Sequence, residues 1–281
     1  MEKYLENHLE SPPLSQKEFN SAKESQKELR NLFPENVLRN LHSEFEYREN
    51  DTQRIELQEG GSLTFSYEMV TPELINELRI LFRDVGTSLI QDLENGRFRR
   101  ISKFVIETGS GRRLDFSTLP VRNIFFTIDN NDWVKNIAIP EKGDVIMYEP
   151  PTTFLGIINM LHEIGHLVDG QRMNSEDINI SQIASNEYAQ EQHSLHILPS
   201  KKRQERFDLV AEVVLNEERN AWASAISMLK PVLSAFDISR EELLESIHSV
   251  SLTAYSHDIR QARIMQGGLI KVLGEIAKKL F

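Results

Sequence analysis

Cysteine is absent from the 281 residues of the chain, and basic residues are fewer than acidic ones. Without cysteine, neither a disulfide framework nor a thiolate metal site can form, and the composition fits a reducing compartment. The 32 Lys and Arg residues stand against 43 Asp and Glu residues, which gives a formal net charge of -11. A chain this acidic has no general attraction for nucleic acid or for an anionic membrane, so we predict neither as a partner.

Long apolar runs are also missing. The longest one, at 154–161, is interrupted by Asn159 and is far shorter than the roughly 20 residues of a membrane-spanning helix. The first residues are acidic, whereas a secretory signal begins with basic residues and continues with an apolar stretch. These features predict a soluble cytoplasmic protein.

The residues that are present are typical of a folded protein, with 40% hydrophobic and 27% charged side chains. Residues 1–33 are rich in Glu, Lys, Ser, Gln and Asn and have only scattered apolar positions. We expect them to form a polar leader, either helical or mobile, in front of a single domain over 34–281. The sequence does not indicate the oligomeric state.

Turn signals and the spacing of apolar residues divide this domain into elements. Gly60 and Gly61 separate two alternating segments and predict a hairpin, while Thr71 and Pro72 begin a helix that continues to about residue 95. Strands are expected at 101–106, 121–128 and 144–148, and helices at 153–170, 201–229 and 269–280. Thr152 or Thr153 can cap the first of these helices, and residues 239–242 form a capping box for another helix. Helices before and after a small sheet favour the α+β class.

The expected helix over 153–170 contains the segment His162-Glu163-Ile164-Gly165-His166. Histidines four residues apart lie one turn apart on the same helix face, so both imidazoles can bind one metal ion. Glu163 lies beside the first histidine, where its carboxylate can act on water at the metal without taking a ligand position. Gly165 leaves its helix face without a side chain and permits the close approach of another backbone.

Apolar residues surround this motif on almost every side of the helix, which predicts that the helix is buried. A buried histidine or carboxylate is costly unless it is paired, and a metal ion is a common partner. The alternative is a structural helix whose histidines bind backbone carbonyls. We favour the metal site, because an HExxH segment arises by chance in roughly 2 per cent of chains of this composition.

A catalytic zinc ion has three protein ligands and leaves its fourth position to water. The metzincin spacing would need histidine where Arg172 stands, so the third ligand must come from elsewhere. In the helix over 201–229, Glu218 falls near the middle of the apolar stripe and Glu217 lies toward its edge. We predict Glu218 as the ligand, with Glu217 as the second choice. In a further alternative both glutamates are solvated and pair with neighbours such as Arg219.

The HEIGH segment, followed by the pattern ExxAWxxA at 218–225, resembles the gluzincin branch of the HExxH zinc metallopeptidases. It is similar to the compact intracellular members from bacteria and phages, and the resemblance covers residues 144–225. This resemblance implies a zincin-like fold with a metal-binding core at about 144–230. It also implies that His162, His166 and Glu218 bind Zn²⁺ and that Glu163 is the general base in the hydrolysis of a protein or peptide substrate.

One position departs from the family pattern. Many gluzincins carry Asp or Asn four residues after the ligand glutamate, where it supports a histidine, but this chain has Trp222 there. Because an indole cannot accept a hydrogen bond from an imidazole, the support must be built differently. Asp169 and Asn220 are the candidates, unless the ligand assignment is shifted by one residue.

Peptide hydrolysis also needs a donor for the developing oxyanion. We select Tyr255, because it follows the ligand helix in a segment suited to core packing. The other available side chains are Tyr188, His193, His196 and His257.

Two further hypotheses compete with a peptidase. The first is a regulatory protein that retains zinc structurally and binds a partner without hydrolysis. The intact Glu163 argues against it, because this residue is not needed to hold a metal. The second is a metal-free helical scaffold.

Overall fold

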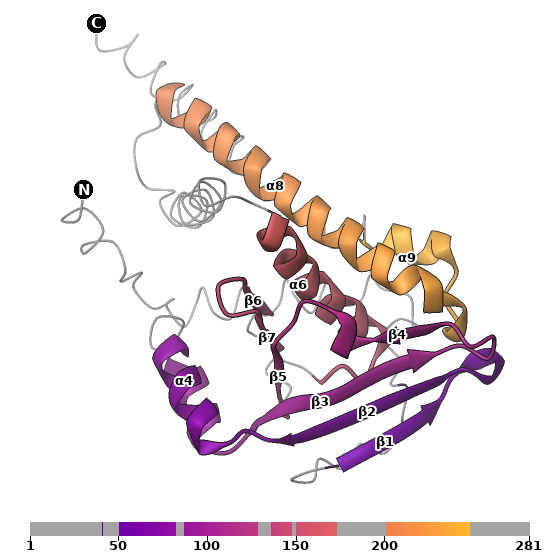
Figure 1. Ribbon diagram of the computed structural model, residues 1–281. Helices are drawn as coiled ribbons and strands as arrows, with labels where there is room; N and C mark the ends of the chain where they lie inside the picture. Colours follow the sequence, from indigo (N-terminus) through magenta and orange to yellow (C-terminus); the bar gives the residue numbers. More distant parts are fainter. Residues whose placement is uncertain are drawn as a thin grey trace, which may run out of the picture.

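Seven strands form one sheet in the computed structural model, which describes residues 41, 51–82, 87–128, 136–147, 150–172 and 201–247. The strands are β1 (Asp51–Glu56), β2 (Ser62–Met69), β3 (Phe98–Glu107), β4 (Arg113–Asp115), β5 (Asn123–Thr127), β6 (Ile137–Ile139) and β7 (Asp144–Met147). Their spatial order is β1-β2-β3-β5-β7-β6, with β4 paired to β3, and only β5 with β7 is a parallel pair. The described part of the chain is therefore of the expected α+β class (Figure 1).

The predicted hairpin is confirmed, because β1 and β2 pair as antiparallel neighbours with Ile55 opposite Leu63. Gly60 makes the turn possible through its φ of 72°, a value that side-chain-bearing residues rarely adopt. Strand β2 also pairs with β3, so the hairpin belongs to the main sheet and is not a separate unit.

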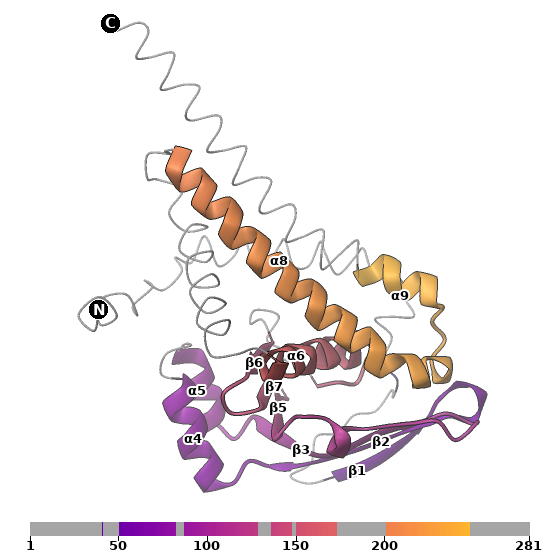
Figure 2. The same cartoon turned by 45° about the horizontal axis from the view of Figure 1, so that its top comes forward.

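One face of the sheet is covered by α6 (Phe154–Arg172) and α8 (Lys201–Leu229). After α8 the chain continues through the short helices η3 (Lys230–Ala235) and α9 (Arg240–Ser246). Every second residue of a strand faces the same side of the sheet, and Phe126 on β5 and Met147 on β7 face these helices in the main hydrophobic core. Figure 2 shows α8 running diagonally over α6, above the sheet.

The opposite face carries a smaller core formed with α4 (Pro72–Phe82) and α5 (Thr87–Glu94). Phe125 and Ile146 point into it, since their neighbours on either side along the strand belong to the main core, and Phe98 belongs to the same smaller core. The prediction of one continuous helix to about residue 95 is wrong. The segment between the two helices contains Gly86, a poor helix former, and the two helices pack against each other.

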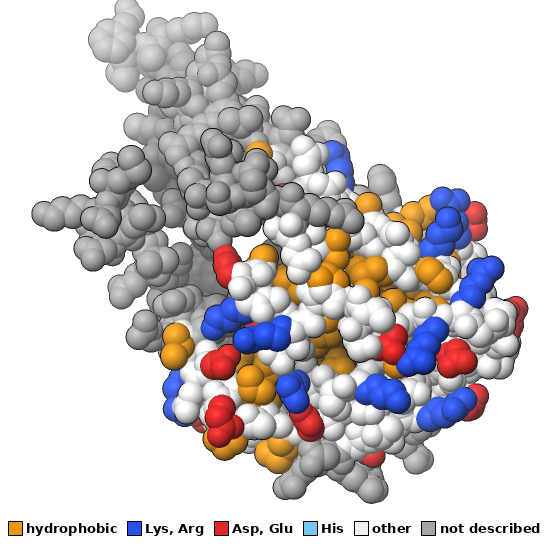
Figure 3. Space-filling model, in the orientation of Figure 1, with side chains coloured by type: hydrophobic (Ala, Val, Ile, Leu, Met, Phe, Trp, Pro, Cys, Tyr) orange, Lys and Arg blue, Asp and Glu red, His pale blue; other side chains and the backbone are white. Residues whose placement is uncertain are grey.

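Other predicted boundaries agree closely with the structure. The helices predicted at 153–170 and 201–229 match α6 and α8, and the capping box is formed by Ser239 and Glu242. The leader 1–33 and the helix at 269–280 lie outside the described residues. Among the residues that the structure describes, no helix has the length and apolar character to cross a membrane. On the face drawn in Figure 3, acidic and basic side chains are interspersed around hydrophobic ones near its centre.

Candidate metal centre

Helix α6 places the two motif histidines inside the protein. Thr153 caps it, because its Oγ1 accepts from the Gly156 N–H at 2.9 Å and its carbonyl accepts from the Ile157 N–H at 3.0 Å. Apolar side chains on every side of the helix are buried, as predicted: Ile157, Leu161 and Ile164 are fully inaccessible. His162 and Glu163 are therefore carried into the core, and each is only 9% exposed.

Helix α8 brings the carboxylate that faces these histidines. Its stripe of small and apolar residues is buried against α6, with Ala221 and Ala225 fully inaccessible. A Cβ on Gly165 would lie 2.3 Å from the carbonyl oxygen of Ala221, so the two helix backbones are in direct contact. Such close packing is possible only because residue 165 has no side chain.

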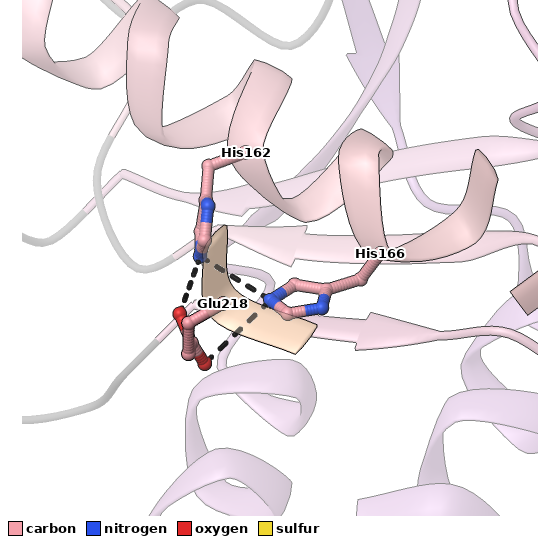
Figure 4. Close-up of side chains that lie close together, drawn as sticks. All are labelled: His162, His166 and Glu218. Carbon is pink, nitrogen blue, oxygen red and sulfur yellow. Dashed lines mark hydrogen bonds and ion pairs between the residues drawn. The ribbon is translucent and has the colours of Figure 1, made fainter. Parts of the chain in front are cut away.

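Three side chains meet at this contact, and Figure 4 shows them pointing toward one another. The Nε2 atoms of His162 and His166 are 3.2 Å apart. Glu218 places one carboxylate oxygen 3.1 Å from Nε2 of His162 and the other 3.7 Å from Nε2 of His166. All ligand atoms of the group lie within 4.8 Å of one another.

The separations of 3.2 Å and 3.1 Å are close to those between the ligands of one tetrahedral metal ion, whereas the second Glu218 oxygen lies farther away, 3.7 Å from His166. Ligands about 2.0–2.1 Å from a tetrahedral centre are about 3.3 Å from each other. The donor set of two imidazoles and one carboxylate also suits zinc, whereas calcium and magnesium prefer oxygen donors alone. The three residues could therefore hold a metal ion, and they supply three of the four ligands of a tetrahedral site.

The structure distinguishes between the two adjacent glutamates. Among the described residues, the group able to hold a metal contains Glu218 and does not contain Glu217. Glu163 is also outside this group, although it is buried next to His162 on the same helix. Of the three side chains, that of His166 is the most exposed, at 25% of its side-chain surface compared with 11% for His162 and 13% for Glu218.

Burial lowers the pKa of His166 to about 4, since the protein interior disfavours the charged imidazolium. The nearby His162 lowers this pKa further, while the negative charge of Glu218 acts in the opposite direction. His166 is therefore neutral at neutral pH. A neutral imidazole has a lone pair free to bind a metal, so the ligand needs no deprotonation.

The same shift predicts how the metal-free protein responds to acid. The folded-state pKa of His166 lies below the ordinary value of 6.5, so between these two values the unfolded chain binds more protons. The stability contributed by this shift should therefore be present above pH 6.5 and decrease by about 3 kcal/mol as the pH falls to 4. Urea unfolding of chelator-treated protein across this range measures the effect. The His166→Asn variant should lack this pH-dependent part of the free energy of unfolding. Identical pH profiles for the variant and the wild-type protein would contradict the assignment to His166.

The predicted support of a motif histidine by Asp169 or Asn220 is not found at His162. Asn220 is exposed, and Nδ1 of His162 has no hydrogen-bond partner among the described residues, so neither Asn220 nor the buried Asp169 supplies one. The indole of Trp222 stacks on the imidazole, with ring centroids 4.2 Å apart and an angle of 25° between the planes. Trp222, which departs from the gluzincin pattern, was not predicted to contact a histidine. Its position four residues after Glu218, and thus on the same helix face, was the available signal.

The predicted oxyanion donor Tyr255 lies outside the described residues. The same is true of Tyr188, His193, His196 and His257. No protein-family model, no curated protein and no solved structure matches the chain.

Proposed function

We propose that the chain is a zinc-dependent peptidase that hydrolyses a peptide bond in a protein or peptide substrate. The observation that carries this proposal is the convergence of His162, His166 and Glu218, whose ligand atoms lie within 4.8 Å of one another, beside the buried Glu163. Two histidines and one glutamate form the ligand set that hydrolytic zinc sites use, with a further position left for water or substrate.

When bound, zinc polarises the scissile carbonyl and makes a water molecule acidic near neutral pH. The ligand residues hold the ion, and the neutral imidazole of His166 allows this without releasing a proton. Glu163 accepts the proton of the attacking water at its carboxylate and transfers it to the leaving nitrogen. Its burial supports this role, because a carboxylate that is largely removed from bulk water interacts more strongly with nearby charges.

Helix packing supports the proposal independently of the motif. Zinc ligands must be held to within about half an ångström, which rigid elements achieve better than loops. All three candidate ligands are on helices α6 and α8, whose backbones touch at Gly165 and Ala221. The resemblance to gluzincins points to the same reaction and to the same division of roles.

The metal content of the purified full-length chain tests the first half of the proposal. We expect about one zinc per chain by elemental analysis, removal by a strong chelator, and recovery of peptide-library hydrolysis on adding zinc back. Glu218→Ala should reduce zinc affinity by at least 100-fold, because one of three ligands is lost.

Glu217→Ala is the matched control, since it removes a carboxylate from the neighbouring position of the same helix. It should keep zinc affinity within about threefold of wild type. Equal zinc binding by the Glu218→Ala variant and the wild-type protein would exclude Glu218 as a ligand. Loss of zinc only in the Glu217→Ala variant would assign the ligand to residue 217.

A further inference from the structure

The indole of Trp222 lies flat against one of the two histidines of the site. Trp222 is on α8 and His162 is on α6, and their rings are stacked at a centroid distance of 4.2 Å. The tryptophan is only 5% exposed. Because it follows Glu218 by one helical turn, the same face of α8 supplies both the carboxylate and the stacked ring.

Among the described residues, none accepts a hydrogen bond from Nδ1 of His162. Its Nε2 faces Glu218 and His166, so Nδ1 is the nitrogen that carries the proton when Nε2 binds a metal. This Nδ1 is buried and has no hydrogen-bond partner among the described residues. Metal-binding histidines usually donate this N–H to a carboxylate or a backbone carbonyl, which fixes the orientation of the ring.

Trp222 cannot take over that hydrogen bond. Its Nε1 is a donor only, and it is likewise buried without a partner in the described part of the chain. The contact between the two residues is therefore made by their ring faces. Rotation of the imidazole about its Cβ–Cγ bond would drive its edge into the indole, so the stacked face restricts this rotation.

The position of the indole is fixed by the packing of α8 against α6. Ala221 and Ala225, which flank it on α8, are fully inaccessible, and the backbone contact at Gly165 fixes the distance between the helices. A rigid ring at a fixed distance from α6 can restrict the rotation of the His162 imidazole. The neighbouring histidine His166 has no stacked ring among the described ring contacts, since it meets the ring of His162 edge to face.

We infer that Trp222 is a positioning residue for the metal site, whose indole face holds the His162 imidazole in the orientation that directs Nε2 toward the metal. It takes the place of the hydrogen-bonded carboxylate or carbonyl that orients histidines in other zinc sites. The inference rests on the metal site of the proposed function. It does not depend on whether the site hydrolyses a substrate.

The test compares Trp222→Phe and Trp222→Leu in the full-length chain. Phenylalanine keeps an aromatic face, while leucine keeps apolar bulk without a flat ring. We expect the zinc Kd, measured by competition with a chromophoric chelator, to rise about 10- to 100-fold for leucine and less than about threefold for phenylalanine. The visible spectrum of the Co²⁺-loaded protein should change for leucine only, because its bands report ligand geometry.

Fluorescence gives a second readout. The chain has two tryptophans, so Trp133→Phe leaves Trp222 as the single one. Co²⁺ binding should quench the emission of this variant with the same midpoint as the spectral titration, because the indole lies against a ligand ring. Emission that does not respond to bound Co²⁺ would contradict the inferred contact with a metal ligand.

Phe236→Leu is the control for general loss of packing. Phe236 is buried and meets Phe154 edge to face, with ring centroids 5.0 Å apart, and it is not one of the three candidate ligands. Its loss should lower the denaturation midpoint without changing the zinc Kd or the Co²⁺ spectrum. The same Kd and spectral change in both leucine variants would reduce Trp222 to a packing residue and overturn the inference.

The remaining outcomes separate the inference from the proposed reaction. A Trp222→Leu protein with wild-type zinc affinity and spectrum would overturn the inference and leave the peptidase proposal intact. A wild-type chain that binds zinc but cleaves no peptide, while the leucine variant loses affinity, would support the inference and refute the reaction. A wild-type chain that binds no metal would overturn both.

Discussion

Glu163→Gln should abolish peptide hydrolysis while leaving zinc bound. The amide has the same shape as the carboxylate but cannot accept the proton of the attacking water, so the rate should fall by at least about 10²- to 10⁴-fold. Glu163 is outside the group of three ligand atoms, and the zinc Kd should therefore stay within about threefold of wild type. Initial rates on a peptide library, together with zinc titration of both proteins, measure the two effects.

The Glu217→Gln variant is a suitable companion, because it makes the same chemical change on the neighbouring helix and should retain activity. Full hydrolysis by Glu163→Gln would rule out Glu163 as the general base. If the wild-type and Glu163→Gln proteins both hold zinc and both fail to cleave any peptide, the chain is better described as a zinc-containing partner-binding protein. Elemental analysis that finds no metal in the wild-type protein would favour the helical scaffold.

Gly165→Ala should disrupt both the fold and the metal site. The new Cβ would lie 2.3 Å from the Ala221 carbonyl oxygen, a distance that requires α6 and α8 to move apart. Because the contact is with backbone, no rotamer change can relieve it. We expect a loss of about 3 kcal/mol or more in the free energy of unfolding, larger than the gain of about 1 kcal/mol that alanine normally brings to a helix.

Zinc affinity should fall in the same variant, because moving α8 carries Glu218 away from the histidines. Urea unfolding and zinc competition measure the two quantities. Gly170→Ala is the matched control on the same helix, where the new Cβ would approach only the Pro140 side chain at 3.1 Å. Its effect on stability should be within about 1 kcal/mol, with unchanged zinc affinity. Wild-type zinc affinity and stability in Gly165→Ala would show that the contact between α6 and α8 does not determine the distance of Glu218 from the histidines.

Local signals predicted individual elements well. Thr153 and the capping box at Ser239 mark helix starts through hydrogen bonds between residues three or four positions apart, which need no tertiary context. The helix predicted as continuous to about residue 95 failed for the converse reason. Apolar spacing continues through a turn when both helices face the same core, so periodicity alone misses the interruption between α4 and α5.

The sequence by itself determined which side chains share a helix face. Four-residue spacing places His162 beside His166, and the centre of an apolar stripe favours Glu218 over Glu217. Only the tertiary structure decided how far apart those faces lie and how they are rotated, including the stacking of Trp222 on His162. The periodicity of a helix sets directions within that helix, whereas the separation of two helices depends on what fits between their backbones. In this chain that separation is set where Gly165 meets Ala221.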